Sequence, residues 1–421
     1  MMMSNGNSLV YGASFMKATV TMMYCYFSIT LLCFNVMFDL FIIALPSYLL
    51  MIPNFIPKTT YTRYMTSLIN YTTPIVFSIP MIFSGTKIYC DNPELLIASK
   101  AKNSLLLSNH GSRIDWMVGM FVGYTKEMCG IACNRTRVGF VCEFLIQYMP
   151  FIGWYRKIIC DDIFVKRSFL QDAEFIQKNI YDFSQSDEKR MLFLSPEGVI
   201  VDYGKEDMDY AKNCRDYCVS EGYDPFAFVL TPRYKGSSCL LDQVNDGGPI
   251  VSICVAFVRD NKLLNCQITS RHRIIPDIYH LIQGISGYPV DIYINLKQLH
   301  FTAKDCKKVL MDDYKRKDIL LAKWNRHLKK ENLRNKLMSE YFPVRVNVND
   351  AIVSHVLHAL SIYIFSYTFG INAQMMTLFI WLFILVSTSH LFGWMMNSTS
   401  MESVPFETGI KALLRCIKDK V

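Results

Sequence analysis

Charged residues are scarce in this sequence, and the residue patterns that hold metal ions are missing. Only 19% of the 421 residues are charged. The 14 cysteines are scattered, and Cys214 and Cys218 have no matching cysteine or histidine pair nearby, so no metal site is expected. We therefore interpret the cysteines as free thiols facing a reducing cytosol. Internal repeats and low-complexity segments are also missing, so the chain does not read as a repeat array.

Apolar residues are correspondingly abundant, at 51% of the chain, and the mean hydropathy is +0.19. Residues 18–52 form an almost wholly apolar run, and about 20 apolar residues suffice to cross a bilayer. The run is too long for a cleavable signal peptide, and no small-residue cleavage site closes it. Residues 1–83 are therefore predicted to be a membrane anchor region, in which the second run, 68–83, is a span, a re-entrant piece or an interfacial helix.

Two further apolar runs, 351–368 and 373–392, predict a transmembrane hairpin within residues 346–395. Twelve lysines and arginines lie between residues 304 and 336, and the tail 396–421 is basic again, so both flanks are expected in the cytosol. We expect an integral membrane protein of the endoplasmic reticulum with its active site near the cytosolic face. The basic segment is either a solvated helical face or a contact for anionic membrane lipids. It borders apolar spans rather than forming a separate module, which argues against a nucleic-acid partner.

The pattern between residues 84 and 345 is that of a globular domain. Longer stretches with the apolar spacing of amphipathic helices, such as 168–183 and 207–220, separate short apolar runs. This alternation predicts an α/β fold with a mostly parallel sheet covered by helices. The runs expected to be strands are 104–108, 191–195, 226–231, 250–258 and 290–296.

A histidine and an aspartate stand five positions apart in the stretch Ser-Asn-His-Gly-Ser-Arg-Ile-Asp at residues 108–115. The spacing of His110 and Asp115 alone decides nothing, because it recurs at His272/Asp277 and His300/Asp305. Only His110 lies between an apolar strand and an apolar helix, the setting in which α/β folds expose reactive side chains. We therefore place the candidate active site at this turn.

A second block, Ser-Pro-Glu-Gly at residues 195–198, also follows an apolar strand. Pro196 and Gly198 would hold the carboxylate of Glu197 in a tight turn. The ends of parallel strands meet at one edge of a sheet, so this turn is expected beside His110.

These two blocks, about eighty residues apart, resemble those of the glycerolipid acyltransferases, and most closely the branch that includes the lysocardiolipin acyltransferase. The likeness covers most of residues 84–345 and the terminal spans, with further similar segments at 148–154, 163–167, 230–236, 253–257 and 320–342. It implies transfer of an acyl group from acyl-CoA to the hydroxyl of lysophosphatidic acid or a related lysophospholipid. Acyl-CoA would be a co-substrate, and no cofactor is expected.

The residues of the first block suit this chemistry. His110 can remove the proton of the attacking hydroxyl as a general base, and Asp115 can orient its ring. Backbone N–H groups around Gly111 and Ser112 could face the developing oxyanion. Ser112 could be a nucleophile, but capping of the new helix is the favoured interpretation. The lipid hydroxyl replaces a serine nucleophile, and no Gly-x-Ser-x-Gly elbow is present.

The resemblance assigns Pro196, Glu197 and Gly198 to acceptor binding. A glutamate would repel a phosphate, so Glu197 is expected to bond a hydroxyl or to support the loop. Arg167 is then the candidate cation for the phosphate, with an ordinary surface arginine as the alternative, and Arg233 has the same two interpretations.

This chain departs from the family pattern at the acceptor end. Val199 and Ile200 follow the Pro-Glu-Gly turn where the family often has threonine and a polar or basic residue, and Glu143 and Gln147 replace residues that are commonly basic. Two other hypotheses therefore stay open. One is a catalytically degenerate lipid-binding membrane protein, and the other is a CoA-independent phospholipid transacylase.

Overall fold

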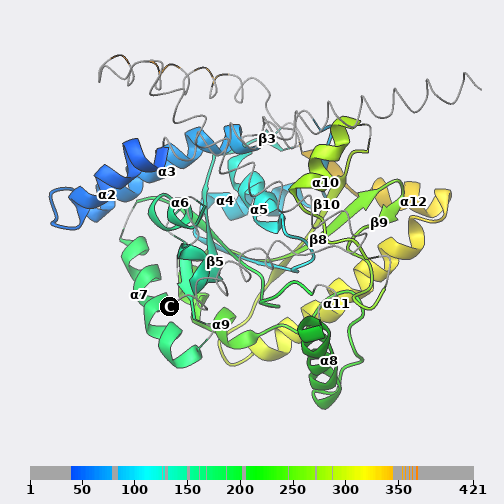
Figure 1. Ribbon diagram of the computed structural model, residues 1–421. Helices are drawn as coiled ribbons and strands as arrows, with labels where there is room; N and C mark the ends of the chain where they lie inside the picture. The colour runs from blue at the N-terminus through cyan, green and yellow to red at the C-terminus, as the bar shows by residue number, and fades with distance from the viewer. Residues whose placement is uncertain are drawn as a thin grey trace, which may run out of the picture.

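A computed structural model gives the fold (Figure 1). It describes residues 39–344 except 78–83, 126, 129–130, 149–151, 161, 167, 186, 202–204, 245, 271–272 and 287, together with five separate positions between 353 and 367. Most of the predicted first span, nearly all of the predicted hairpin, the basic tail and Arg167 lie outside the described residues.

Within the described part of the chain, nine strands form one sheet in the order β11-β1-β10-β8-β2-β7-β5-β6, and β9 pairs with β8 at the side. A separate two-stranded ribbon consists of β3 (Glu127–Met128) and β4 (Ile131–Ala132). The strands of the large sheet are β1 (Lys87–Cys90), β2 (Ser104–Ser108), β5 (Arg137–Glu143), β6 (Ile163–Val165), β7 (Arg190–Leu194), β8 (Ile250–Arg259), β9 (Lys262–Leu263), β10 (Asp291–Leu299) and β11 (Phe342–Val344).

The sheet is mostly parallel, as the sequence predicted. β2 pairs in parallel with both β7 and β8, and β5 pairs in parallel with β6 and β7. β1 is parallel to β10, whereas β10 runs antiparallel to β8, and β11 runs antiparallel to β1. Each predicted run at 104–108, 191–195, 250–258 and 290–296 overlaps one of these strands.

Helices cover both faces of the sheet, which explains why β2 is a continuous apolar run rather than an alternating one. Leu106 packs with residues of α5 on one face, while Leu105 and Leu107 pack with residues of α7 and α11 on the other. Figure 1 shows α5 and α10 above the sheet and α9 and α11 below it. The helices of this layered domain are α4 (Pro93–Ala101), α5 (Asp115–Tyr124), α6 (Ile152–Ile158), α7 (Phe169–Ser184), α8 (Lys205–Ser220), α9 (Tyr234–Cys239), α10 (Ile278–Ile282), α11 (Cys306–His327) and α12 (Glu331–Met338).

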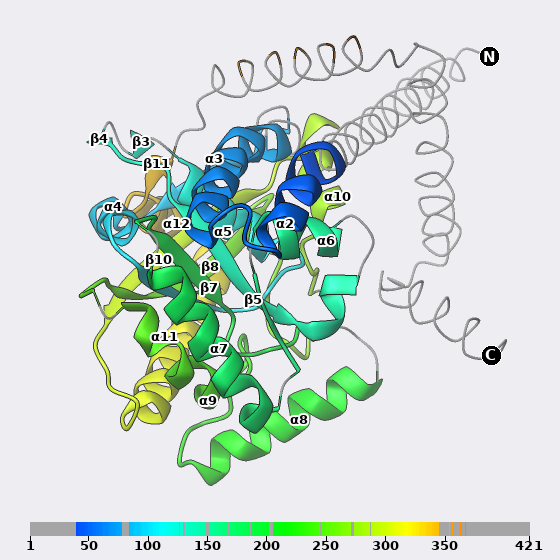
Figure 2. The same ribbon diagram turned by 90° about the vertical axis from the view of Figure 1, so that its left-hand side faces the viewer.

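The N-terminal helices pack against α6, on the side of the domain that faces the viewer in Figure 2. They are a π-helical turn, η1 (Asp39–Ala44), followed by α2 (Leu45–Met51) and α3 (Lys58–Phe77). Met65 and Ile69 of α3 share a buried cluster with Tyr155 and Ile159. Among the residues described, no helix combines the length and the apolar character that crossing a bilayer requires.

One predicted strand is wrong. Residues 226–231 form an irregular loop instead of joining the sheet. Pro225 and Pro232 flank the segment, and proline cannot donate a backbone hydrogen bond to a ladder. The carboxylate of Asp318 on α11 accepts the N–H groups of residues 227, 228 and 229 at 2.8, 2.6 and 3.4 Å. These backbone donors are therefore satisfied without a neighbouring strand.

Candidate functional site

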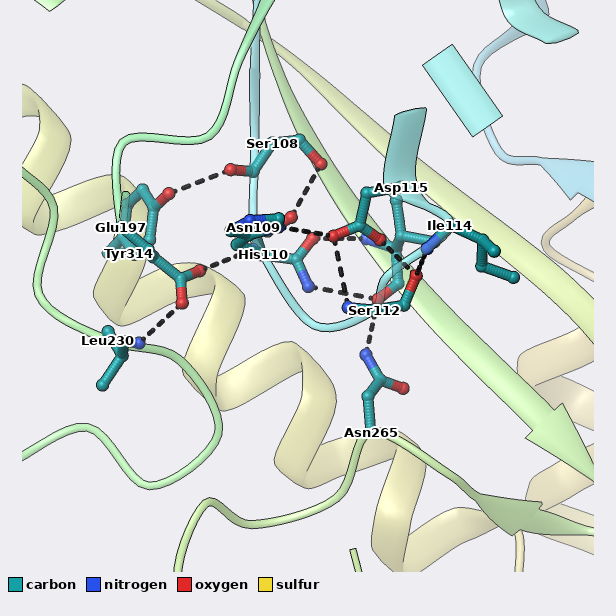
Figure 3. Close-up of polar contacts among 11 residues, drawn as sticks. Ser108, Asn109, His110, Ser112, Ile114, Asp115, Glu197, Leu230, Asn265 and Tyr314 are labelled. Carbon is teal, nitrogen blue, oxygen red and sulfur yellow. Dashed lines mark hydrogen bonds and ion pairs between the residues drawn. The ribbon is translucent and has the colours of Figure 1, made fainter. Parts of the chain in front are cut away.

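The two predicted blocks meet at one edge of the sheet. β2 and β7 are parallel neighbours with Leu107 opposite Leu194, so the turns that follow them leave the sheet side by side. The backbone N–H of His110 donates a hydrogen bond of 2.8 Å to Oε1 of Glu197 (Figure 3). The structure thus brings together residues that are 87 positions apart.

His110 and Asp115 form a direct side-chain contact. Nδ1 of His110 lies 3.0 Å from Oδ2 of Asp115. The histidine side chain is 28% exposed and the aspartate side chain 3%. Residues five apart in a straight helix point in different directions, but Asp115 is the first residue of α5 and His110 lies in the preceding turn. Because Asp115 occupies Nδ1, Nε2 is the ring atom that remains to exchange a proton with a substrate.

Ser112 is fully buried and supports the aspartate. Its backbone N–H lies 3.2 Å from Oδ2 of Asp115, and its hydroxyl donates to Oδ1 at 2.8 Å. The same hydroxyl accepts the N–H of Ile114 at 3.1 Å, just before α5 begins. A hydroxyl bonded in this way is poorly suited to nucleophilic attack. The Ser112 amide is directed at Asp115 rather than at an oxyanion, which leaves the Gly111 amide as the oxyanion candidate.

Two asparagines that the sequence did not single out fix the turn. Asn109 is 2% exposed, and its side chain donates to the carbonyl of Val255 at 3.2 Å and accepts the N–H of the same residue at 2.8 Å. Asn265 donates to the Val255 carbonyl as well, at 3.0 Å. A Cβ added to Gly111 would lie 2.9 Å from Nδ2 of Asn265, so the turn leaves no room for a side chain there. Asn109 adjoins the histidine, but nothing in the sequence marks Asn265.

Glu197 is buried, at 3% exposed, rather than a solvated turn residue. One carboxylate oxygen accepts the N–H of His110, and the other accepts the N–H of Leu230 at 3.1 Å. Burial raises the pKa of Glu197, and the two backbone hydrogen bonds oppose this effect. Both oxygens bond to the main chain, so this carboxylate ties together three loops, and of the two predicted roles the geometry matches loop support.

Pro196 and Gly198 shape the turn around this carboxylate. Gly198 has φ +74°, a conformation that glycine adopts at little cost, and its N–H donates to Ser195 at 3.0 Å. The carbonyl of Pro196 accepts the N–H of Arg233 at 2.8 Å. The guanidinium of Arg233 lies over Gly198, and its Nε donates to the hydroxyl of Tyr210 at 3.1 Å. Arg233 is therefore a cation that the structure places at this turn, whereas Arg167 lies outside the described residues.

The unusual Val199 has a packing role. It is partly buried against a cluster formed by Val201, Ala211, Leu230 and Ile268. This cluster joins α8 to the loop that bonds Glu197. No contact among the described residues explains Ile200.

The two rival histidine and aspartate spacings do not give the same arrangement. Asp305 accepts a hydrogen bond from Thr302 at 2.8 Å, and His272 lies outside the described residues. Asp277 instead contacts His280, whose Nδ1 lies 2.7 Å from Oδ1. Within the described ranges, no group of three or more histidine, cysteine, aspartate or glutamate side chains is placed to bind a metal ion.

Curated proteins similar to this chain are acyltransferases by name. A probable 1-acyl-sn-glycerol-3-phosphate acyltransferase 5 of Arabidopsis thaliana is 25% identical over 245 residues, 57% of this chain and 56% of the relative. Lysocardiolipin acyltransferase 1 of Mus musculus is 24% identical over 195 residues, 45% of this chain and 47% of the relative. A third relative, 1-acyl-sn-glycerol-3-phosphate acyltransferase 3 of Arabidopsis thaliana, is 26% identical over 178 residues, 42% of this chain and 43% of the relative.

The chain thus spans about half the length of the curated relatives it matches. No protein-family model matches it. All three relatives are named as acyltransferases. In the structure, the His-Gly-Ser-Arg-Ile-Asp and Ser-Pro-Glu-Gly blocks meet at the end of a mostly parallel sheet. These relatives support the assignment of the chain to the glycerolipid acyltransferases, which it resembles in both blocks.

Proposed function

We propose that the protein transfers a fatty acyl group from acyl-CoA to the free hydroxyl of a lysophospholipid. The observation that supports this most directly is the pair formed by His110 and Asp115, in which a partly exposed imidazole is oriented by a buried carboxylate. The names of the relatives favour lysophosphatidic acid or a related lysophospholipid as the acceptor.

In the proposed reaction, Nε2 of His110 removes the proton of the lipid hydroxyl as its oxygen attacks the thioester carbonyl. Asp115 holds the ring in the productive tautomer and stabilises the imidazolium. When the tetrahedral intermediate collapses, the carbon–sulfur bond breaks and the imidazolium returns the proton to the departing thiolate of CoA. A correctly placed base of this kind contributes roughly 10²- to 10⁴-fold in rate. The bonded state of Ser112 favours direct transfer without an acyl-enzyme intermediate.

For the acceptor end, we assign Arg233 to the phosphate of the lysophospholipid. Its guanidinium is exposed beside the Pro-Glu-Gly turn and carries a fixed positive charge. Glu197, with both oxygens bonded to the main chain, would support the turn rather than contact the phosphate.

The same proposal places the protein in the endoplasmic reticulum membrane with the site near the cytosolic face. Several large apolar side chains between η1 and α3 are exposed, among them Phe55 at 77%, Ile52 at 61% and Leu49 at 56%. Exposed apolar groups gathered at the end of one helix and in the turn that follows it are typical of surfaces that contact lipid.

A lysolipid panel tests the proposal. The full chain, purified in detergent, is assayed with one acyl-CoA and with lysophosphatidic acid, lysophosphatidylinositol or monolysocardiolipin in turn. We expect CoA release and diacyl product with at least one acceptor, and loss of both in His110→Ala. Lysolipid binding without turnover would favour the degenerate lipid-binding protein, and product formation without added acyl-CoA would favour the transacylase.

A further inference from the structure

Two buried polar side chains of α11 contact the last carbonyl groups of β2, directly before His110. The hydroxyl of Tyr314 donates to the carbonyl of Ser108 at 3.0 Å, and Nζ of Lys317 donates to the carbonyl of Leu107 at 2.9 Å. Both side chains are 0% exposed. Figure 3 shows Tyr314 beside Ser108 and Glu197, on the side of the strand opposite Asp115. The bonds join segments more than 200 positions apart in the sequence.

Lys317 is held by a buried carboxylate of its own helix. Its Nζ lies 3.2 Å from Oδ2 of Asp313. Asp313 also binds Nε of Arg316 at 3.0 Å and the hydroxyl of Ser252 at 2.6 Å. Burial lowers the pKa of Lys317, and the charge of Asp313 opposes this. Because Asp313 keeps Arg316 and Ser252, the loss of Lys317 would not leave this carboxylate without a partner.

The same two side chains interact electrostatically with Glu197. Burial raises the pKa of Glu197, and the Lys317 cation is among the groups that oppose the rise, so it favours the carboxylate that accepts the His110 amide. For Tyr314, burial and the nearby carboxylates of Glu197 and Asp313 raise the pKa well above its ordinary value. Its hydroxyl therefore stays protonated and able to donate to Ser108.

A buried lysine is weak support for a fold. Replacing a buried ion pair by apolar residues is often neutral or stabilising, because taking a charge out of water is costly. Besides its contact with Asp313, Lys317 donates a hydrogen bond to the carbonyl of Leu107, three residues before His110. This placement favours a role in the geometry of the turn.

We propose that Tyr314 and Lys317 are positioning residues for His110, acting through the Leu107 and Ser108 carbonyls and through Glu197. They fix the end of β2 so that the imidazole meets both Asp115 and the substrate. The inference rests on the proposed function, because positioning has a catalytic meaning only if His110 is the base. Neither residue would touch the substrate.

The test compares Tyr314→Phe and Lys317→Met with matched controls in the detergent-purified full chain. Tyr341→Phe removes a hydroxyl from another buried tyrosine, which packs on Trp324. Lys307→Met removes a cation from the exposed part of α11, where it pairs with Glu221 at 2.7 Å. Displacement of a catalytic group by about 1 Å can lower a rate 10²-fold, so we expect kcat to fall about 10-fold in Tyr314→Phe and about 100-fold in Lys317→Met. KM for acyl-CoA and the melting temperature should stay near the wild-type values, as should every parameter of the controls.

Hydrogen–deuterium exchange provides a measurement that does not depend on turnover. Amides of the peptide that spans residues 107–115 should exchange about 10-fold faster in both variants and at the wild-type rate in both controls. If exchange in this peptide is unchanged, or if kcat and KM change together with a lowered melting temperature, the positioning role is refuted. If the wild-type protein transfers no acyl group while exchange responds as expected, the proposed function fails and the structural clamp stands.

Discussion

The described part of the chain contains two histidine–aspartate pairs with nearly the same distance between Nδ1 and the carboxylate, and they differ in the burial of the aspartate and in their surroundings. In one pair, Nδ1 of His110 lies 3.0 Å from Asp115, and in the other, Nδ1 of His280 lies 2.7 Å from Asp277. The two histidine side chains are also similarly exposed, at 28% and 21%. The carboxylates differ more, with Asp115 at 3% and Asp277 at 23% exposed.

The second pair is a local helix cap. Asp277 directly precedes α10, and its carboxylate accepts the backbone N–H of His280 at 3.0 Å. The carboxylate of Asp277 also contacts Nδ1 of His280, so both contacts lie within one helix turn. By contrast, the first pair joins a turn to a helix and is connected through Glu197 and Ser108 to distant segments. A short histidine–aspartate distance therefore identifies a candidate base only when the pair is also bonded to segments outside its own helix turn.

The largest expected difference between the pairs is in turnover. His110→Ala should lower kcat by roughly 10²- to 10⁴-fold, because it removes the proposed base. His280→Ala should leave kcat within about two-fold, because a cap supports the helix and not the reaction. Initial rates of CoA release by the two variants measure this, and equal losses in both would contradict the assignment of the base.

Substitution of each aspartate by asparagine should also lower kcat in the first pair and not in the second, but by less than the histidine substitutions do. Asp115→Asn keeps an oxygen for Ser112 but no longer holds Nδ1–H of His110, so kcat should fall roughly 10²-fold with little change in KM. Asp277→Asn retains a good capping residue and should have almost no effect on kcat. An Asp115→Asn variant with wild-type kcat would show that the ring needs no orienting carboxylate.

The packing around the first pair leads to a third expected effect. Gly111→Ala places a Cβ 2.9 Å from Nδ2 of Asn265, so it should lower the free energy of unfolding by about 1–3 kcal/mol and also lower kcat. Gly236 lies in α9 with nothing within 4 Å of an added Cβ, and Gly236→Ala should raise stability by about 0.5–1 kcal/mol. Urea unfolding of both variants measures these changes, and an unaffected Gly111→Ala protein would refute the close packing of the turn.

The smallest expected effect concerns the dependence of stability on pH. Burial alone would raise the pKa of Asp277, but the hydrogen bond and charge of His280 lower it overall. Asp277 therefore contributes stability above its unfolded pKa of about 3.9, and this contribution is lost as the pH falls through the lower folded pKa. Asp277→Ala should cost about 1 kcal/mol at pH 7 and progressively less in acid.

The stability that Glu197 contributes should change with pH in the opposite direction, because burial raises the pKa of Glu197 in the folded protein. Its contribution is fully present below the unfolded pKa of about 4.3 and is lost as the pH rises through the folded pKa. The stability of Glu197→Gln relative to wild type should therefore increase with pH, while that of Asp277→Ala decreases. Melting temperatures between pH 4 and 8 distinguish the two, and parallel curves would contradict the difference in environment.

The sequence predicted the parts of the site that are local. His110, Asp115 and Glu197 follow apolar runs that become β2 and β7, and neighbouring parallel strands necessarily deliver their turns to one edge. Asn265, Tyr314 and Lys317 could not be found in this way, because they reach the site from segments 150 to 210 positions away. Their residue types are unremarkable until the chain is folded.

The strands, too, could be predicted only where the local sequence pattern decides the structure. Strands β2 and β8 were predicted because they are mainly apolar and buried along nearly their whole length, whereas β10 was predicted from an apolar run that alternates with polar residues. Residues 226–231 have a similar composition, yet the carboxylate of Asp318 binds their amides and keeps them out of the sheet. Short strands such as β1 and β6 contain too few residues to show any periodicity.

Asn109 has a consequence for how a catalytic loop can leave a sheet. Past the end of β2, its side-chain amide offers Val255 one donor and one acceptor, as the main chain of a continuing strand would. The side chain thus replaces the backbone hydrogen bonds of a strand to Val255, and the backbone can turn toward α5. A carboxylate or an aliphatic group of the same size cannot perform both halves of this exchange. The histidine loop can therefore leave the sheet while the backbone groups of Val255 in β8 stay hydrogen-bonded.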